Sequence, residues 1–277
     1  MKMLYVALSI IVFIIIALCV TALFDRNIKD KLNTTAYRVI DRKSNINVER
    51  VTEEGYIPKQ ILQTYKTLEE VPDYVISNIK TKNPDWEYIF YDDSKCIEFL
   101  GNEFGEPFVT KFKSFKKGAH KSDLFRICWL YKNGGVYMDI DSELIVPLTD
   151  IIDTISGYTI LQNDVRGSYY YEVITKILNT KHDRLVNSFM IINKGNDNIK
   201  KCINNIMKVE QKDLEGNYAL ILFIMQITIG EEMSYQIFER RPDGFNPISK
   251  RMEMYTIDNK KIGYTCYNKY KNGSFKN

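Results

Sequence analysis

Apolar residues fill the start of the chain without interruption, whereas later segments alternate between apolar and polar positions. From Leu4 to Phe24 no residue is charged. Because about 20 apolar residues span a bilayer core as a helix, this stretch predicts a membrane anchor over residues 1–24. A cleaved signal peptide is the rival interpretation, since Val20-Thr21-Ala22 resembles a cleavage site. Its apolar part would, however, exceed the roughly 7–15 residues usual for such signals.

The next segment, residues 25–54, is rich in charged and amide side chains and has little apolar periodicity. It predicts a solvated stem between the anchor and a folded domain over residues 55–277. Arg26, Lys29 and Lys31 follow the anchor and only Lys2 precedes it, so the flanking charges alone do not favour a lumenal domain. Long domains translocate largely regardless of such charges. We therefore expect a single-pass type II membrane protein whose domain faces an ER- or Golgi-type lumen.

Strand-like and helix-like segments alternate through the predicted domain. Short stretches of alternating or β-branched residues predict strands, and apolar residues three or four apart predict helices. Such alternation is typical of an α/β domain with a mainly parallel sheet. The strands are expected near residues 56–65, 86–91, 136–141, 158–162 and 188–192, and the helices near 71–82, 97–100, 119–132, 199–207 and 218–229.

The most informative segment runs from Ala119 to Asp141. A helix is expected to end at Asn133-Gly134-Gly135, because glycine accepts the left-handed backbone that a helix C-terminus requires. A strand follows, and side chains two residues apart on a strand share a face. Asp139 and Asp141 are therefore expected on one face at the end of that strand. Two adjacent carboxylates are costly without a positive partner, which points to a divalent cation.

The donor types restrict which cation is suitable. Carboxylate oxygens without histidine or thiolate favour Mg²⁺ or Mn²⁺, and Mg²⁺ in proteins commonly also holds substrate phosphates. Asp123 and Arg126 lie three apart and so share one face of the preceding helix with the apolar Ala119 and Leu130. They form either an exposed ion pair of little consequence or a pair turned toward the strand-end site, where an arginine can bind a diphosphate with two hydrogen bonds.

Composition excludes other classes of protein. The chain has 277 residues, is 45% hydrophobic and carries a net charge of only +3, from 38 basic and 35 acidic residues. This even balance, without a long basic stretch, argues against a nucleic-acid partner. Five cysteines without a closely spaced pair, together with two histidines, argue against structural zinc and favour free thiols.

Two blocks of residues resemble a known family, the DXD-containing sugar-binding-region glycosyltransferases of glycosyltransferase family 32. This family includes yeast initiating mannosyltransferases and capsular polysaccharide enzymes. The resemblance covers about Tyr56 to Asp141. Its residues are Ile57, Pro58, Lys59, Ile61, Gln63, Thr64, Tyr65, Asn83, Pro84, Trp86, Tyr88, Asp92 and Asp93 in the first block, and Ala119, Ser122, Asp123, Arg126, Leu130, Tyr131, Gly134, Gly135, Tyr137, Asp139 and Asp141 in the second.

This resemblance implies a GT-A fold, which is a Rossmann-like fold that binds nucleotide sugars. It implies a GDP- or UDP-sugar donor, a glycan or glycolipid acceptor, and transfer of a hexosyl group with retention of anomeric configuration. It also implies Mn²⁺, or Mg²⁺, bridging the diphosphate. Asp139 and Asp141 would hold the metal, and Asn268 stands where relatives often carry a histidine-bearing segment that completes the ligand set.

The same resemblance assigns roles to five further residues. Asp123 would bind hydroxyl groups of the donor sugar and Arg126 would approach the sugar or phosphate, with Asn187 on the acceptor side. Gln63 and Tyr65 would line the nucleotide side, where relatives usually have tryptophan in place of Tyr65.

Two other functions stay open from the residues. The altered C-terminal segment is compatible with a catalytically weak or inactive nucleotide-sugar-binding protein. A phosphatase of the haloacid-dehalogenase type also carries D-x-D at a strand end. That motif continues with threonine or valine two residues later, whereas Glu143 stands here.

Overall fold

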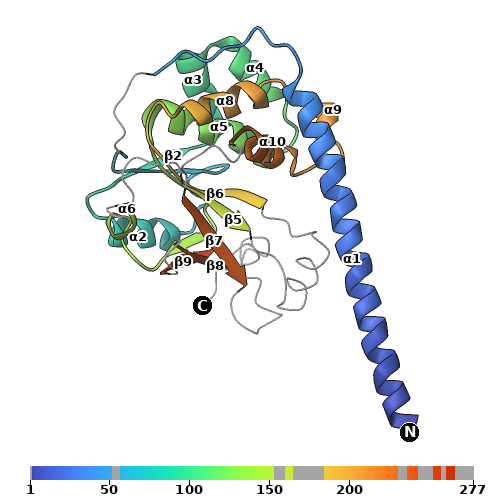
Figure 1. The fold of residues 1–277 in the computed structure, drawn as a ribbon. Coiled ribbons are helices and arrows are strands. Elements are labelled where there is room, and N and C mark those ends of the chain that lie inside the picture. Colours follow the sequence, from blue (N-terminus) through green and yellow to red (C-terminus); the bar gives the residue numbers. More distant parts are fainter. Residues whose placement is uncertain are drawn as a thin grey trace.

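The computed structural model describes residues 2–51, 57–152, 160–164, 184–229, 236–242, 252–256 and 260–265, and the description of side chains has gaps before Asp30. The predicted α/β class is confirmed, because helices cover a central sheet (Figure 1). The helices are α1 Lys2–Ile40, α2 Asp73–Lys82, α3 Asp93–Phe104, α4 Glu106–Ser114, α5 Gly118–Asn133, α6 Thr149–Ile152, α8 Asp197–Ile206, α9 Gln211–Leu214 and α10 Leu220–Ile229. The strands are β1 Gln60–Thr64, β2 Glu87–Tyr91, β3 Gly135–Met138, β4 Ser142–Leu144, β5 Ile160–Asp164, β6 Arg184–Ile192, β7 Gln236–Pro242, β8 Met252–Tyr255 and β9 Lys261–Thr265.

The sheet is mixed, so the expectation of a mainly parallel sheet is wrong. In the order β2-β1-β3-β6-β5-β7-β8-β9-β4, only the β1–β2, β1–β3 and β5–β7 pairings of the described strands are parallel. The reason lies in the connections. Parallel neighbours need a crossover of a dozen or more residues, whereas β7, β8 and β9 follow one another at shorter spacing and pair antiparallel.

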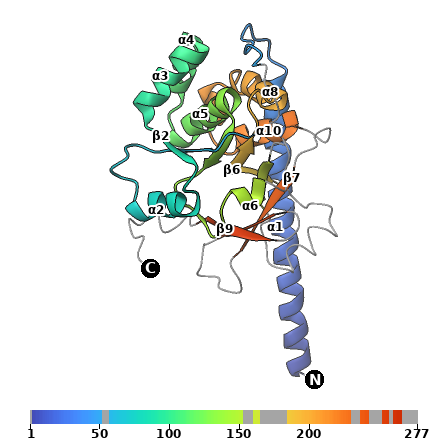
Figure 2. The same cartoon turned by 90° about the vertical axis from the view of Figure 1, so that its left-hand side faces the viewer.

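Helices pack on both faces of the sheet and divide the core into two layers. Figures 1 and 2 show α3, α4, α5, α8 and α10 on one face and α2 and α6 on the other. Neighbouring residues of one strand accordingly enter different hydrophobic clusters, Leu62 facing the larger helical layer and Ile61 the smaller one. Because β1 lies between β2 and β3 with both faces covered, every central position of this strand is buried.

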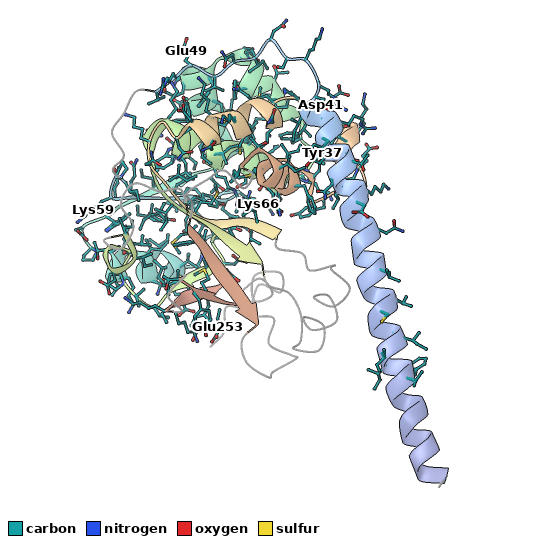
Figure 3. All side chains as sticks on the ribbon, in the orientation of Figure 1. Tyr37, Asp41, Glu49, Lys59, Lys66 and Glu253 are labelled. Atoms are coloured by element: carbon teal, nitrogen blue, oxygen red, sulfur yellow. The ribbon has the colours of Figure 1, made fainter. Side chains whose placement is uncertain are left out.

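The segment expected as a solvated stem is instead helical and packed. Helix α1 continues to Ile40, and Leu32, Ala36 and Val39 are buried in the larger core cluster. This end of α1 lies beside α9 and α10 (Figure 3, where Tyr37 and Asp41 mark it). Thr34, Tyr37 and Arg38, between these positions, are exposed. Charged and amide residues elsewhere in residues 25–54 explain why composition alone suggested a solvated segment. Apolar residues spaced by four and three are typical of a helix that buries one stripe.

The predicted membrane anchor was compared with the helices of the structure. Among the residues that the structure describes, no helix combines the length and the apolar character needed to cross a bilayer. The anchor over residues 1–24 and the domain boundaries stay predictions.

The junction between α5 and β3 depends on two glycines. Gly134 and Gly135 have φ values of 74° and 99°, which residues with a Cβ rarely adopt. A Cβ on Gly134 would lie 2.8 Å from the Lys194 nitrogen, and one on Gly135 would lie 2.7 Å from the Gln60 carbonyl oxygen. The predicted helix stop is therefore confirmed, and the glycines also let β3 approach β1 closely.

Candidate active site

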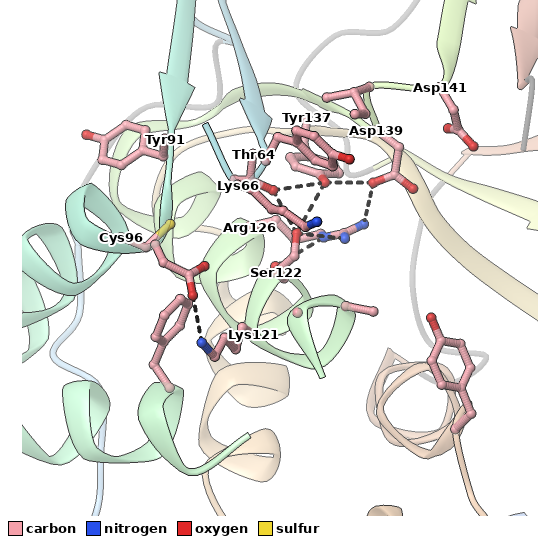
Figure 4. Close-up of a pocket in the computed structure, with 17 residues that line it drawn as sticks. Thr64, Lys66, Tyr91, Cys96, Lys121, Ser122, Arg126, Tyr137, Asp139 and Asp141 are labelled. Carbon is pink, nitrogen blue, oxygen red and sulfur yellow. Dashed lines mark hydrogen bonds and ion pairs between the residues drawn. The ribbon is translucent and has the colours of Figure 1, made fainter. Parts of the chain in front are cut away.

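A cavity of about 760 Å³ opens where β1 and β3 end, next to the first turns of α5. Lys59 and Lys66 mark the two ends of β1 in Figure 3, and the cavity lies at the Lys66 end. This position agrees with the rule that open α/β sheets bind ligands beyond the carboxyl ends of their strands. Its lining residues include Tyr65, Lys66, Tyr91, Asp93, Cys96, Phe112, Lys121, Ser122, Arg126, Tyr137, Asp139, Asp141 and Tyr218 (Figure 4).

Asp139 and Asp141 both line this cavity, but they do not share one face of a strand. Strand β3 ends at Met138, and the two acids lie in the turn before β4. The Ser142 N–H donates to the Asp139 carbonyl at 3.0 Å and closes this turn, while the Asp139 N–H donates to the Ser188 carbonyl at 2.8 Å. The predicted proximity of the two acids to a cavity is therefore met through a turn. In Figure 4, Asp139 is joined to Tyr137 and Arg126, and Asp141 lies to one side of it.

Arg126 is the buried cation of the site. Its guanidinium donates to the Asn187 carbonyl at 2.6 Å and to the Ser122 hydroxyl at 2.9 Å. It also lies 3.2 Å from Asp139 Oδ1 and stacks over the Tyr137 ring at 4.2 Å. Of the two readings of the Asp123–Arg126 pair, the inward one is therefore correct.

Asp123 and Asn187 lie behind Arg126. The Asn187 amide donates to Asp123 Oδ1 at 2.8 Å, and the same oxygen lies 3.5 Å from Arg126 Nη2. Both residues are buried, and neither belongs to the lining of the described cavity. In the described part of the chain they therefore orient the arginine, and a direct contact with a ligand stays a prediction.

Three hydroxyl groups complete the network, on residues that the sequence analysis named for the family resemblance but gave no role in the site. The Tyr137 hydroxyl donates to Asp139 Oδ1 at 2.6 Å and lies 3.3 Å from the Ser122 hydroxyl. The Thr64 hydroxyl lies 2.8 Å from that of Ser122. A signal for Tyr137 was present in the sequence, because it stands two residues before Asp139 and so shares its side of the strand.

Gln63 and Tyr65 were both expected on the nucleotide side, but only Tyr65 reaches the cavity. Gln63 is fully buried, accepts from the Tyr88 hydroxyl at 3.1 Å and donates to the Asp139 carbonyl at 3.3 Å. A direct contact between Gln63 and a nucleotide is therefore a wrong expectation. Both faces of β1 are covered, so the alternation on this strand does not turn Gln63 outward.

The electrostatics of the cluster follow from its burial. Burial acts to lower the pKa of Arg126, but the Tyr137 phenol and the Asp139 and Asp123 carboxylates outweigh it, and the pKa lies above its usual value. Burial raises the pKa of the Asp123 carboxyl against the opposing effects of Arg126 and Asn187. Arg126 is therefore a permanent positive charge beside the cavity.

The donor set fits a hard divalent cation. Asp139 and Asp141 supply carboxylate oxygens from one turn, and both contacts of Asp139 with Tyr137 and Arg126 are made through Oδ1. Three carboxylates against one guanidinium leave a local excess of negative charge. Within the described ranges no cluster of three or more His, Cys, Asp and Glu side chains is placed to hold a metal. Mg²⁺ and Mn²⁺ commonly keep water and phosphate oxygens as remaining ligands. Asn268, the expected third ligand, lies outside the described residues.

The opposite end of the cavity carries aromatic rings and a second ion pair. Tyr91, Cys96 and Phe112 line this end. Lys121 Nζ lies 2.6 Å from Asp93 Oδ2 and thereby joins α5 to α3. Figure 4 shows Lys121 and Cys96 well separated from Asp139 and Asp141.

Comparison with known proteins agrees with this geometry. Residues 69–159 match the family described as glycosyltransferase sugar-binding region containing DXD motif. Inositol phosphoceramide mannosyltransferase 3 of Schizosaccharomyces pombe is 35% identical over 88 residues, which are 31% of this chain and 24% of that protein. Mannosyl phosphorylinositol ceramide synthase of Saccharomyces cerevisiae is 31% identical over 36% of this chain and 26% of its own length. An initiation-specific alpha-1,6-mannosyltransferase of Candida albicans is 30% identical over 34% and 27%.

These matches are regional. Each covers about a quarter of the relative concerned. The family match over residues 69–159 contains α5 and the two acids. Among solved structures, the PaToxG Glycosyltransferase is similar at a TM-score of 0.43 and 15% identity, over 76% of this chain and 79% of that one. A TM-score this low does not establish a shared fold. The family resemblance predicted from the sequence is confirmed for the matched region.

Proposed function

We propose that this protein transfers a hexosyl group from a nucleotide sugar to a glycan or glycolipid acceptor, because residues 69–159 match the glycosyltransferase sugar-binding region containing DXD motif. The domain around this region takes the GT-A fold in this proposal. The transfer depends on Mn²⁺ or Mg²⁺ and retains the anomeric configuration, as the sequence resemblance implies.

One observation carries the proposal. Asp139 and Asp141 stand at the edge of a cavity large enough for a nucleotide sugar, with the buried Arg126 beside them. Two neighbouring acids at a cavity edge beside a buried arginine suit a metal-bound diphosphate better than a structural role.

The chemistry needs charge stabilisation at the leaving group. A bound divalent cation would neutralise the negative charge that develops on the diphosphate as the glycosyl–phosphate bond breaks. Arg126 adds a fixed positive charge whose position is set by Ser122 and Asn187 before any ligand binds. Asp123 holds the arginine from behind and, in this proposal, accepts hydrogen bonds from the donor sugar. No protein base is assigned, since in such transfers the departing phosphate can take the acceptor proton.

The relatives suggest the substrates. Three proteins named as mannosyltransferases or as a mannosyl phosphorylinositol ceramide synthase are similar to about a third of this chain. We therefore place mannosyl first among the hexosyl groups and a glycolipid first among the acceptors.

The N-terminal helix supports a membrane location. Residues 4–24 carry no charge, and Val12, Phe13 and Ile16 are about half exposed or more on the part of α1 that extends away from the sheet (Figure 1). Exposed apolar side chains in such a row suit a lipid environment. In this proposal the helix anchors a single-pass type II protein whose domain faces the lumen of the secretory pathway.

The decisive test uses the full chain in detergent or nanodiscs with a panel of GDP- and UDP-sugars. The wild type should release nucleoside diphosphate in Mn²⁺ and stop when the metal is chelated. Asp141→Asn should lower this rate by at least about a thousandfold, because the leaving group loses its charge stabilisation. Asp150→Asn, at an exposed position of helix α6 outside the cavity lining, is the matched control and should leave the rate unchanged.

Three results would contradict the proposal in different ways. Unchanged turnover in Asp141→Asn would remove the assigned site. Donor binding without any turnover would favour the inactive binding protein. Release of inorganic phosphate from simple phosphomonoesters would favour the phosphatase.

A further inference from the structure

The ion pair at the aromatic end of the cavity has no role in the chemistry proposed above. Asp93 and Lys121 both line the cavity, and their 2.6 Å contact uses Oδ2 of the carboxylate. Among the described residues, Oδ1 of Asp93 has no hydrogen-bond partner. Lys121 Nζ also lies over the Phe112 ring at 5.3 Å. The pair therefore presents an acceptor and a cation side by side, next to aromatic surfaces.

The position of this pair suits the nucleoside of the donor. If the acids at one end hold the diphosphate, the nucleoside must extend along the cavity, because a nucleotide sugar is a linear molecule with the diphosphate between base and sugar. Tyr91 and Phe112 give the far end aromatic surfaces of the kind on which bases stack. Figure 4 shows Lys121 and Asp139 at different ends of the site.

The chemistry of the pair distinguishes one base from another. Guanine carries two adjacent donors, N1–H and the N2 amine, beside the O6 acceptor. An ionised carboxylate is an acceptor only, with two oxygens that match two adjacent donors, and an ammonium group donates to O6. Uracil offers a single N3–H between two carbonyl oxygens. A carboxylate set against uracil therefore meets a carbonyl oxygen and is repelled, and such repulsion is an effective source of specificity.

We propose that Asp93 and Lys121 form a base-recognition subsite that selects guanine over uracil, so that the donor is a GDP-sugar. This inference rests on the proposed function, since it places the nucleoside relative to the assigned diphosphate site. Asp93 accepts from N1–H and the N2 amine of guanine, and Lys121 donates to O6.

The test measures binding of three nucleoside diphosphates to the full chain in Mn²⁺ by calorimetry. GDP should bind about 10- to 100-fold more tightly than UDP, the range that one two-hydrogen-bond contact to a base supplies. Inosine diphosphate lacks only the N2 amine and should bind about tenfold more weakly than GDP, through the loss of one hydrogen bond to a charged group.

The variant Asp93→Asn isolates the carboxylate. It should weaken GDP binding by about 10-fold or more, tighten UDP binding because the repulsion of a uracil carbonyl oxygen is removed, and abolish the difference between GDP and inosine diphosphate. The control is Glu103→Gln, which breaks another ion pair between α3 and α5, Glu103 with Lys132 at 3.4 Å, away from the cavity lining. It should leave all three affinities unchanged, so a general loosening of α3 is separated from a lost base contact.

The outcomes separate this inference from the proposed function. Equal affinity for GDP and UDP, or a GDP-to-inosine-diphosphate ratio that Asp93→Asn does not change, overturns base recognition and leaves glycosyl transfer intact. Turnover of UDP-sugars in preference to GDP-sugars does the same. Absence of binding by any nucleoside diphosphate overturns both.

Discussion

Two arginine–carboxylate clusters in this protein differ in their balance of charge: one surrounds the buried Arg126 with acids, and the other surrounds the buried Asp213 with donors. At the cavity, Arg126 meets Asp123 and Asp139 with Asp141 nearby. Between α1 and α9, Asp213 accepts from Arg42 at 2.5 and 2.7 Å, from Arg38 at 3.4 Å and from the Glu210 N–H at 2.8 Å. The first cluster has more carboxylates than arginines, and the second surrounds one carboxylate with donors.

The difference indicates what each cluster is for. A carboxylate that accepts four hydrogen bonds from its own chain is saturated, and its role is to fasten α1 to the domain. The cavity cluster keeps excess negative charge at a surface that a ligand can reach, which costs stability unless a cation compensates it. Buried ion pairs alone do not identify a functional site, whereas unbalanced charge beside a cavity does.

The largest effect is expected from Arg126→Gln. This change leaves Asp123 and Asp139 without their counter-charge and should lower the free energy of unfolding by about 3 to 5 kcal/mol, with loss of activity. Denaturant unfolding measures the first and nucleoside diphosphate release the second. Arg42→Gln, in the other cluster, should destabilise the protein without lowering the turnover of the molecules that remain folded. Equal loss of turnover in both variants would erase the distinction between the clusters.

Two milder variants, one in each cluster, test whether stability and activity are lost separately. Asp213→Asn keeps an acceptor for the Glu210 N–H but removes the charge that holds Arg42, and should cost about 2 to 3 kcal/mol of unfolding free energy with normal kcat/KM. Asp123→Asn should change stability by only about 1 kcal/mol, because the carboxylate charge is already disfavoured by burial, and should lower kcat/KM. A loss of kcat/KM in Asp213→Asn, together with a normal kcat/KM in Asp123→Asn, would refute the roles given to the clusters.

The smallest expected effect is a dependence of stability on pH, caused by the Asp213 carboxyl. Burial acts to raise the pKa of Asp213, but hydrogen bonds from Arg42 and the Glu210 N–H outweigh it and hold the pKa below its usual value. A carboxyl with a depressed folded-state pKa stabilises the protein above its unfolded value of about 4, and this contribution is lost as the pH falls toward the folded value. Urea midpoints of the wild type and Asp213→Asn should therefore converge below about pH 4. A constant difference down to pH 3 would contradict the assignment.

The sequence predicted the site region well because its signals are local. Helix α5, its stop at Gly134 and the two acids follow from periodicity, a backbone requirement and neighbouring charges. The direction of the strands in the C-terminal half was not predictable in this way, because pairing depends on contacts between distant segments. Gln63 was placed wrongly for a related reason, since a strand covered on both faces gives alternation no outward side.

The N-terminal segment was misread although its signal was present. Leu32, Ala36 and Val39 lie on one side of a helix, but charged and amide residues before and after them dominated the composition of residues 25–54. A partner for that stripe, helix α10, lies far along the chain and is itself apolar nearly throughout. Only the tertiary contact shows that this part of α1 belongs to the domain.

The close approach at Gly134 and Gly135 has a genetic consequence. Every single-nucleotide change of a glycine codon that replaces the residue adds a side chain, and here the first carbon of any side chain would overlap backbone or side-chain atoms of neighbouring segments. To relieve the overlap β3 must shift, and the turn with both acids shifts with it. Missense alleles at these two codons should therefore behave as null alleles even though neither residue contacts a substrate.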